Sequence, residues 1–423
     1  MNFYSKSTLS IVTKFILMAL QLLVYLLINR QLSPTEFGNY TLLFANACFI
    51  QLIFSGGFDV AVVHFFSVKN FKKIFSQLLF NYSKVIAIIL VLLFIGNYLL
   101  GTNALRIGIS SDFLPNRSVL FLFYFASFIV NLFSQSFYLA RGFYVLNNLI
   151  LILAQVILIP LVLVFNQPDA IILSYAICNL MPLILIPFFK NKASVIVLQK
   201  EIKATQFWKY ALVVAFINIV QFMAYRADYW LIDKNLKPQD LALYANAMKF
   251  SQLFWIIPNA LATIIFRELS GGNESLKKSL LGMAHFVFLG LFIASFFYIE
   301  FGGDLVDFFL SHKYKGAANT SFQLLPGTLF FTYNILLSPY FSAQKKLWVN
   351  GSISFFSALF LIIADFILIP KYGLNAAIEV NNACYIFGGV LTLIAYIYFE
   401  KISWRAAWNW KQNFKNFRTI KIE

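Results

Sequence analysis

The sequence predicts an all-α, polytopic membrane protein with about twelve transmembrane helices. Hydrophobic residues make up 60% of the 423 positions and charged residues only 12%, and the mean hydropathy is +0.76. A soluble domain carries about 25% charged residues and about 45–50% apolar ones. A chain this apolar has too little interior to hide its apolar surface in water. The composition therefore excludes a cytosolic enzyme, a nucleic-acid-binding module and a disulfide-stapled secreted domain.

Twelve stretches of the chain are long and apolar enough to span a bilayer, which takes about 20 residues. We interpret the first as a retained helix rather than a signal peptide, because no small-residue cleavage site follows it. The expected spans are residues 8–29, 39–58, 80–100, 118–139, 146–165, 170–189, 210–232, 241–266, 280–299, 321–343, 349–369 and 376–399.

The distribution of basic residues supports this map and sets its orientation. With the N-terminus inside, the cytoplasmic segments hold 22 of the 33 Lys and Arg residues, and the outer loops hold eight. Short cytoplasmic loops are enriched in Lys and Arg, so both termini are expected to be cytoplasmic. The net charge of +16 is then explained by topology and lipid headgroups rather than by nucleic acid.

An internal repeat relates the two halves of the chain. Residues 28–34 (Ile-Asn-Arg-Gln-Leu-Ser-Pro) align with residues 232–238 (Ile-Asp-Lys-Asn-Leu-Lys-Pro) at an offset of 204, and the match continues through Tyr40 and Tyr244. A further match pairs the Leu-Ile-Pro of 158–160 with that of 368–370. Six helices per half preserve orientation, so the repeat is parallel.

This repeat predicts two six-helix bundles, residues 1–207 and 208–400, followed by a basic cytoplasmic tail, residues 401–423. Transporters commonly use such repeats, which rock against each other around a site near the bilayer midplane. The tail is both basic and aromatic, which favours contact with anionic lipids of the inner leaflet. We therefore expect a transporter.

No residue constellation indicates catalysis. The chain has no Walker-type glycine loop, no catalytic triad and no paired carboxylates in a large loop. Its three cysteines, Cys48, Cys178 and Cys384, are far apart within apolar runs. The sequence thus predicts no catalytic residue, no metal and no bound cofactor, and an ion gradient as the energy source.

Basic residues at membrane depth are the candidate substrate-binding groups: Lys14, Arg226 and Lys249. Charged groups are costly in lipid and normally face a bundle interior or a wet cavity. A cationic cavity suits an anionic headgroup, and the planar fork of Arg matches phosphate. Two structural alternatives stand beside this hypothesis. Lys249 and Asp228 would neutralise each other and lock two helices together, and Lys14 would snorkel to the interface.

Three acidic residues within or near the spans are candidates for ion coupling: Asp228, Asp59 and Asp365. A carboxylate at this depth can change its protonation or bind a cation during a transport cycle, which would couple transport to a proton or sodium gradient. The alternative is a polar contact that only holds helices together.

Three segments resemble one known family when they are taken in order along the chain. They are residues 32–40 (Leu-Ser-Pro-Thr-Glu-Phe-Gly-Asn-Tyr), residues 226–232 (Arg-Ala-Asp-Tyr-Trp-Leu-Ile) and residues 368–374 (Leu-Ile-Pro-Lys-Tyr-Gly-Leu). Together they are similar to the O-antigen and capsular polysaccharide flippases of the multidrug/oligosaccharidyl-lipid/polysaccharide (MOP) exporter superfamily. Twelve helices fit this branch better than the fourteen usual in lipid II flippases.

The resemblance implies a MATE-like, V-shaped pair of bundles in the bacterial inner membrane. It also implies a substrate, an undecaprenyl-diphosphate-linked oligosaccharide, that moves from the inner to the outer leaflet by alternating access. The polymerase and chain-length proteins of the same pathway are expected partners, and nucleic acid is not. The chain departs from the family pattern in two ways that matter here: His64 stands where many relatives have arginine, and Asp365 where asparagine is usual.

Two rival functions make different predictions. A cation-coupled exporter of drugs or small metabolites on the same fold predicts resistance phenotypes without a glycan defect. A membrane enzyme such as a polysaccharide polymerase or ligase needs a large outer loop, and the expected spans leave none.

Overall fold

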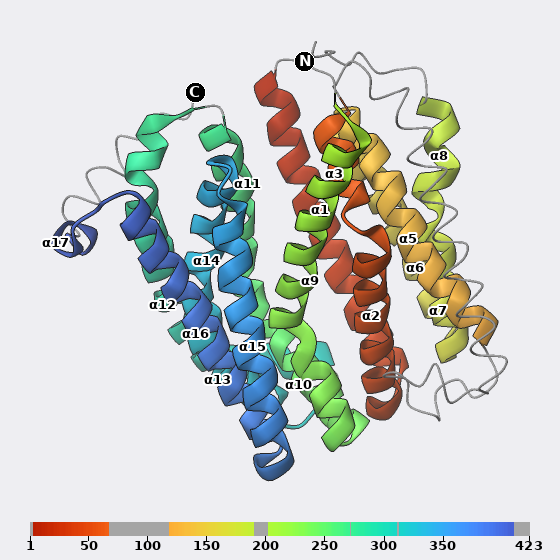
Figure 1. Ribbon diagram of the computed structural model, residues 1–423. Helices are drawn as coiled ribbons and strands as arrows, with labels where there is room; N and C mark the ends of the chain where they lie inside the picture. Colours follow the sequence, from red (N-terminus) through yellow and green to blue (C-terminus); the bar gives the residue numbers. More distant parts are fainter. Residues whose placement is uncertain (1–2, 67–117, 190–201, 271, 311–312, 410–423) are drawn as a thin grey trace. The chain divides into compact units, whose positions relative to one another are not determined.

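A computed structural model describes residues 3–66, 118–189, 202–270, 272–310 and 313–409, and all regular structure in these ranges is helical (Figure 1). The expectation of an all-α, polytopic membrane protein is confirmed. The chain forms two compact units, Met1–Ile219 and Val220–Glu423, which we call the N-terminal and C-terminal units. The boundary between the two units lies inside one long helix, Ala204–Asn235. The division of the sequence at 207/208 into functional bundles stays a prediction.

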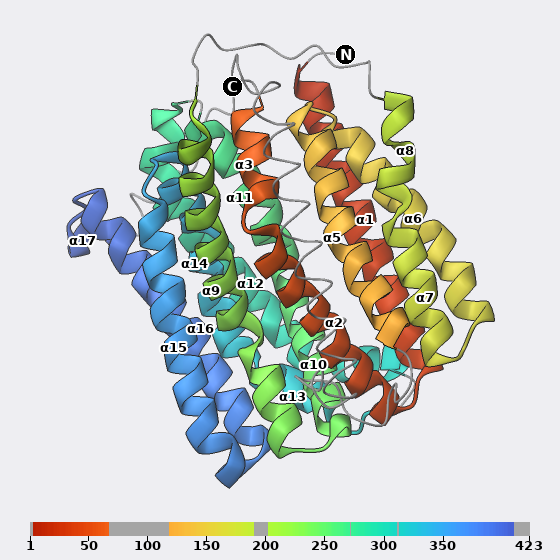
Figure 2. The same ribbon diagram turned by 45° about the vertical axis from the view of Figure 1, so that its right-hand side comes forward.

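In the N-terminal unit, α1 packs along α6, and α5 packs against α2, α3 and α7 (Figure 2). The first part of α9 (Ala204–Asn235) completes the unit. The helices before it are α1 (Phe3–Gln31), α2 (Pro34–Ser55), α3 (Phe58–Phe65), α5 (Ser118–Ala140), α6 (Tyr144–Val164), α7 (Pro168–Asn179) and α8 (Met181–Phe189).

In the C-terminal unit, α16 packs between α14 and α15, and α14 also contacts α11 and α12. Both ribbon views show α15 and α16 side by side along their length (Figures 1 and 2). The unit holds the rest of α9, α10 (Pro238–Ser251), the 3₁₀ helix η1 (Gln252–Trp255), α11 (Ile256–Ser270), α12 (Glu274–Leu310), α13 (Ala317–Gln323), α14 (Leu325–Ala343), α15 (Leu347–Tyr372), α16 (Leu374–Phe399) and α17 (Trp404–Ala407).

Within the described ranges, ten helices are long and apolar enough to cross a membrane. They correspond to ten of the twelve expected spans. The span expected at 80–100 lies outside the described residues. The span expected at 321–343 is divided between α13 and α14, and α14 is not among the ten because its sequence is less apolar.

Several expected spans are broken rather than continuous. Gly56 (φ 51°) and Gly57 (φ 69°) separate α2 from α3, and η1 separates α10 from α11. A third break follows Asn179, where the side-chain amide of Asn131 donates to the Asn179 carbonyl (2.9 Å). Backbone groups freed at membrane depth need such partners, because lipid offers none.

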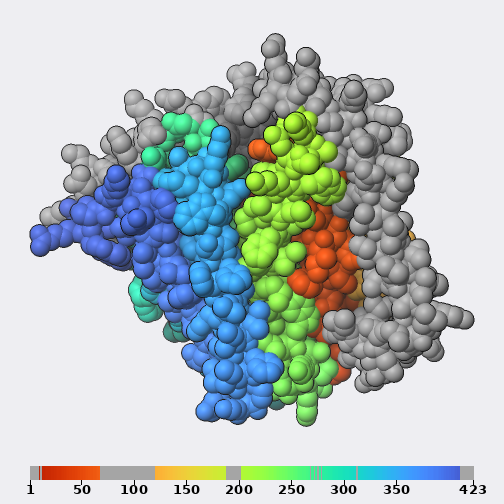
Figure 3. Space-filling view, viewed as in Figure 1, coloured from red at the N-terminus to blue at the C-terminus, as the bar shows by residue number. Residues whose placement is uncertain are grey.

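Several helices present large apolar side chains outward. On α15 these include Phe356, Phe360 and Phe366, and on α12 they include Phe296 and Phe297. Figure 3 shows the outer face of α15 running the length of the unit. Soluble monomers rarely expose apolar surface of this extent, so these faces fit a chain surrounded by lipid.

Candidate functional site

Arg226 projects from α9 and is held by two side chains. Its Nη1 donates to the Tyr229 hydroxyl (3.0 Å), and its Nη2 donates to Oε1 of Gln252 (3.3 Å). The guanidinium carbon also lies 4.9 Å from the centroid of the Tyr229 ring, a cation–π distance. Tyr229 lies one helical turn beyond Arg226, so α9 itself sets the direction of the guanidinium.

The break between α10 and α11 brings Gln252 to Arg226. Gln252 is the first residue of η1, and Trp255 is the last. The indole N–H of Trp255 donates to the Thr328 carbonyl on α14 (2.8 Å), which anchors the break. Gln252 and Tyr229 are site residues that the sequence analysis did not single out. The sequence did offer one signal for Gln252, namely a neutral amide side chain in an apolar stretch shortly before Pro258.

Lys249 lies in the last turn of α10 and is half-buried. It lies within electrostatic range of Arg226, which is itself within range of Asp228. The C-terminal unit therefore gathers two of the three predicted substrate-binding cations. Their role in binding stays a prediction.

Asp228 is completely buried, and three groups donate to it. The Tyr244 hydroxyl from α10 (2.6 Å) and the Asn381 amide from α16 (3.2 Å) share Oδ2, and the backbone N–H of Tyr229 donates to Oδ1 (2.9 Å). Asp228 therefore ties three helices together through uncharged donors, and Arg226 also lies within its electrostatic range. The alternative in which Asp228 and Lys249 neutralise each other stays a prediction.

Asp365 on α15 is completely buried, and neither of its carboxyl oxygens has a hydrogen-bond partner among the residues that the structure describes. It lies within electrostatic range of Asp228. The hydroxyl of Tyr385 and Oδ1 of Asn381, both on α16, are also buried without partners in the described ranges. A buried polar group without a partner is costly, so this cluster has capacity to bind something more.

The remaining two predicted residues belong to the N-terminal unit. Lys14 is exposed on α1. Asp59 lies in the first turn of α3, directly after the Gly56–Gly57 break, and is largely buried. Its Oδ1 has no hydrogen-bond partner within the described part of the chain. The expected span ended at residue 58, whereas helix α3 continues to Phe65, so Asp59 is not at the end of its helix.

No group of three or more His, Cys, Asp or Glu side chains is placed to hold a metal in the ranges that the structure covers. The three cysteines, all of which the structure describes, form no disulfide. The site is therefore built from one Arg, one Lys and two Asp side chains together with Tyr, Asn and Gln partners.

The fold is that of a polytopic membrane protein, and it is similar to the folds of solved MATE transporters and of a lipid II flippase. The lipid II flippase MurJ, in an inward closed conformation, is similar with a TM-score of 0.73 and 12% identity, covering 97% of this chain and 96% of that one. An inward-facing multidrug resistance MATE family transporter is similar with a TM-score of 0.65 and 14% identity, covering 93% of this chain and 99% of that one. A MOP superfamily transporter from Pyrococcus furiosus is similar with a TM-score of 0.64 and 12% identity, covering 93% of this chain and 94% of that one.

At these identities the likeness describes the fold, which the solved transporters and flippases share over almost their whole length. Neither a protein-family model nor a curated protein matches the chain.

Proposed function

We propose that the protein is a flippase that carries an undecaprenyl-diphosphate-linked oligosaccharide from the inner to the outer leaflet of a bacterial inner membrane. The observation that carries the proposal is the position of two basic side chains, Arg226 and Lys249, on the consecutive helices α9 and α10 of one unit, with the Arg226 guanidinium oriented by Tyr229 and Gln252. Like charges repel more strongly where water is scarce. A bound anion would relieve that repulsion.

The contacts of Arg226 suit a diphosphate. A guanidinium has five N–H donors in a fixed fork, and the described residues use two of them, through Tyr229 and Gln252. The remaining donors are available to phosphate oxygens. Lysine adds a second charge without a geometric requirement, which suits a headgroup that must be released on the other side.

For coupling, we propose that Asp228 and Asp365 share a proton or a sodium ion. Two buried carboxyl groups within electrostatic range disfavour a doubly charged state, and a cation bound between them removes the repulsion. Asp59 remains a third candidate in the other unit. No bound cofactor is proposed. An ion gradient supplies the energy, and the polymerase and chain-length proteins of the same pathway are proposed partners.

The second candidate is a cation-coupled exporter of drugs or small metabolites, which the MATE likeness keeps open. A cationic drug would be repelled by Arg226 and Lys249 if it bound beside them, although the two Asp side chains would not repel it. Among small metabolites, anionic ones would fit this alternative.

The test is the export of the surface glycan in a deletion strain complemented with variants expressed at equal levels. Arg226→Ala and Lys249→Ala should each lower export strongly, and Arg226→Lys should restore part of it because it keeps the charge but loses the fork. Lys234→Ala, which removes an exposed charge from the same helix α9, is the matched control and should export normally.

Full export by both Arg226→Ala and Lys249→Ala would overturn the site assignment. A normal surface glycan in the deletion strain, combined with new drug sensitivity, would favour the exporter instead.

A further inference from the structure

Two lysines in the C-terminal unit adopt a backbone conformation that glycine usually occupies. Lys345 has φ 58° and Lys401 has φ 52°, whereas every other positive-φ residue in the described ranges is glycine. Each follows the end of a helix, α14 or α16, where a left-handed glycine is the common terminator. Both side chains are exposed. The chain therefore keeps a positive charge at two positions where glycine would be less strained.

These two lysines lie at the same end of the unit. The connection after α14 packs against the end of α16, because Lys346 Nζ lies 4.2 Å from the centroid of the Phe399 ring. Trp348, in the first turn of α15, lies 6.0 Å from the same ring and is 62% exposed. Lys401 follows Phe399 by two residues.

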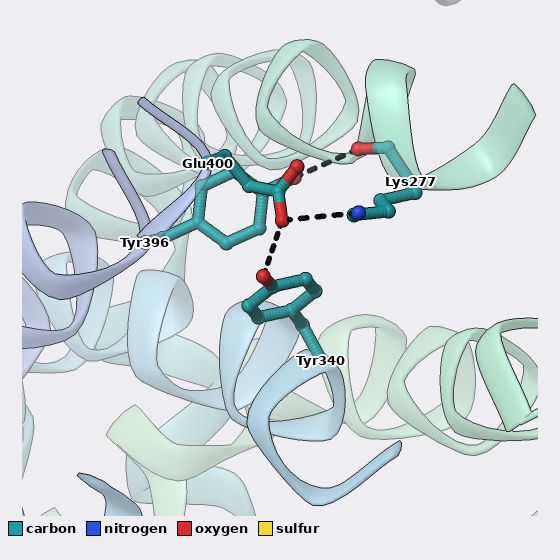
Figure 4. Close-up of polar contacts among 4 residues, drawn as sticks. All are labelled: Lys277, Tyr340, Tyr396 and Glu400. Carbon is teal, nitrogen blue, oxygen red and sulfur yellow. Dashed lines mark hydrogen bonds and ion pairs between the residues drawn. The ribbon is translucent and has the colours of Figure 1, made fainter. Parts of the chain in front are cut away.

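A polar network holds this end of α16 in place (Figure 4). Lys277 Nζ on α12 lies 3.4 Å from Oε1 of Glu400, and the Tyr340 hydroxyl on α14 donates to the same carboxylate. The Tyr396 hydroxyl donates to the Lys277 carbonyl (2.8 Å). The network joins α12, α14 and α16 directly before Lys401, so the chain leaves the bundle at a fixed place.

The short helix α17 is docked on α12 beyond this point. The Ala407 carbonyl accepts a hydrogen bond from Nε2 of His285 (3.1 Å), and the Trp408 ring stacks on the His285 ring at 5.1 Å. The other face of α17 is open: Trp404 is 56% exposed, and Arg405 is also exposed.

The position of His285 sets the depth of α17. His285 lies six residues into the candidate span Ser279–Leu310, which is roughly 9 Å along the helix at 1.5 Å per residue. The span has 32 residues, roughly 48 Å of helix against a hydrocarbon core of about 30 Å. If the helix is centred in the membrane, His285 and Trp408 therefore lie near the edge of that core. Tryptophan is enriched at that depth, and exposed basic groups beside it are placed to meet headgroups.

We propose that this surface, which we call the basic end (Lys345, Lys401, Trp404, Arg405 and Trp408), binds the phosphate of an anionic phospholipid. From Lys401 to its end the chain carries six basic residues and a single acid, so the charge of the segment complements an anionic leaflet. The negative charge of Glu400 is paired with Lys277, and the indoles supply the apolar contact. The proposal depends only on the membrane fold and not on the proposed transport function.

The left-handed lysines give a test in which stability and lipid binding change in opposite directions. The full-length protein is purified in phosphatidylcholine nanodiscs with and without phosphatidylglycerol, and the thermal midpoint and the retained phosphatidylglycerol are measured. Lys345→Gly/Lys401→Gly should raise the midpoint without phosphatidylglycerol, because strain is removed. It should also weaken retention of that lipid, by about fivefold per charge.

Two more variants complete the experiment. Arg405→Gln should weaken retention without raising the midpoint, since its backbone is unstrained. Lys315→Ala/Lys371→Ala removes two exposed charges elsewhere in the same unit and should retain phosphatidylglycerol like the wild type. Unchanged retention in both the glycine and the Arg405 variants would overturn the proposal, as would an equal loss in the control.

Discussion

The two units share a helical plan but differ in where they carry charge. Helices α2 and α10 begin at Pro34 and Pro238, at the offset of 204 found in the sequence. Both beginnings are capped alike: the N–H of Ser33 donates to Glu36 (2.8 Å), and the N–H of Lys237 donates to Asp240 (3.0 Å). Only the first is reciprocal, since the N–H of Glu36 also donates to the Ser33 hydroxyl (3.3 Å), but both satisfy a backbone donor at a helix start. The repeat is therefore present in the structure as well as in the sequence.

The charged site has no counterpart in the N-terminal unit. At the same offset the counterparts are apolar: Leu22, Val24 and Ala45 stand where Arg226, Asp228 and Lys249 stand. The Leu-Ile-Pro match places the neutral Gln155 opposite Asp365. Val24 and Ala45 are buried, so one repeat folds with apolar groups at positions where the other holds charges. The difference shows that the corresponding helices of the other repeat fold without these charges, which supports the proposed role of Arg226 and Lys249 in binding.

The break in the second helix also differs between the units. In the N-terminal unit two left-handed glycines make it, and in the C-terminal unit the 3₁₀ turn η1 makes it without glycine. A Cβ on Gly57 would lie 2.1 Å from the Ala211 carbonyl oxygen, whereas one on Gly56 would meet nothing within 4 Å. Only the N-terminal break depends on a close backbone approach.

The largest expected effect is that of Gly57→Ala. It combines a disfavoured positive φ with a backbone clash, so the free energy of unfolding should fall by about 3 kcal/mol. Gly56→Ala is the control, and it should lose only about 1 kcal/mol because it meets the strain alone. Denaturant titration in mixed micelles measures both. Equal losses of stability in the two variants would mean that the close approach of Gly57 to the Ala211 backbone adds nothing to the cost.

The next effect concerns transport. Arg226→Leu gives the C-terminal unit the residue of its N-terminal counterpart, and it removes a charged donor. Transport of the anionic substrate should fall roughly 10- to 100-fold, the factor that corresponds to one charge-assisted hydrogen bond. Initial rates in proteoliposomes measure this at matched protein density. A change of less than twofold would place the substrate phosphate elsewhere.

Asp228→Val likewise copies the N-terminal unit, but it should lower stability. The mutation leaves the hydroxyl of Tyr244 and the amide of Asn381 buried without an acceptor, at a cost of about 2 kcal/mol. Combining it with Tyr244→Phe should recover part of that loss. If the double variant is no more stable than the single one, the hydrogen bond from Tyr244 is not what stabilises the wild type.

The smallest effect on stability is expected for Asp365→Gln, which replaces a buried, partnerless carboxyl group by the amide found in the other unit. Stability should change by no more than about 1 kcal/mol, because one buried polar group without a partner replaces another. If the proposed coupling is right, transport should lose its dependence on the ion gradient. Gradient-dependent transport at the wild-type level would remove Asp365 from the coupling site.

The sequence predicted the membrane class and most of the spans, because length and hydropathy determine both. It did not predict the breaks at Gln252–Trp255 or after Asn179. A hydropathy window counts apolar residues, and it does not show whether a carbonyl has a donor such as Asn131 nearby. The end of α3 was missed for a related reason: Asp59 and His64 interrupt the apolar run while the backbone continues as helix.

The charged members of the site were predictable, but their partners were not. Arg226, Asp228, Lys249 and Asp365 stand out because ionisable groups are rare in apolar stretches. Tyr244, Asn381 and Gln252 are ordinary residue types for these helices, and only their tertiary contacts give them a role. The contacts of Asp228 with neutral donors from two other helices, Tyr244 and Asn381, were among those that the sequence did not reveal.

The two side-chain hydrogen bonds of Arg226 go to different helices. Tyr229 is on the same helix, so that bond travels with α9 whatever the neighbouring helices do. Gln252 is on the broken helix, so that bond depends on the rotation of η1 against α9. A rotation of η1 against α9 would therefore break the hydrogen bond to Gln252 and leave the bond to Tyr229 intact.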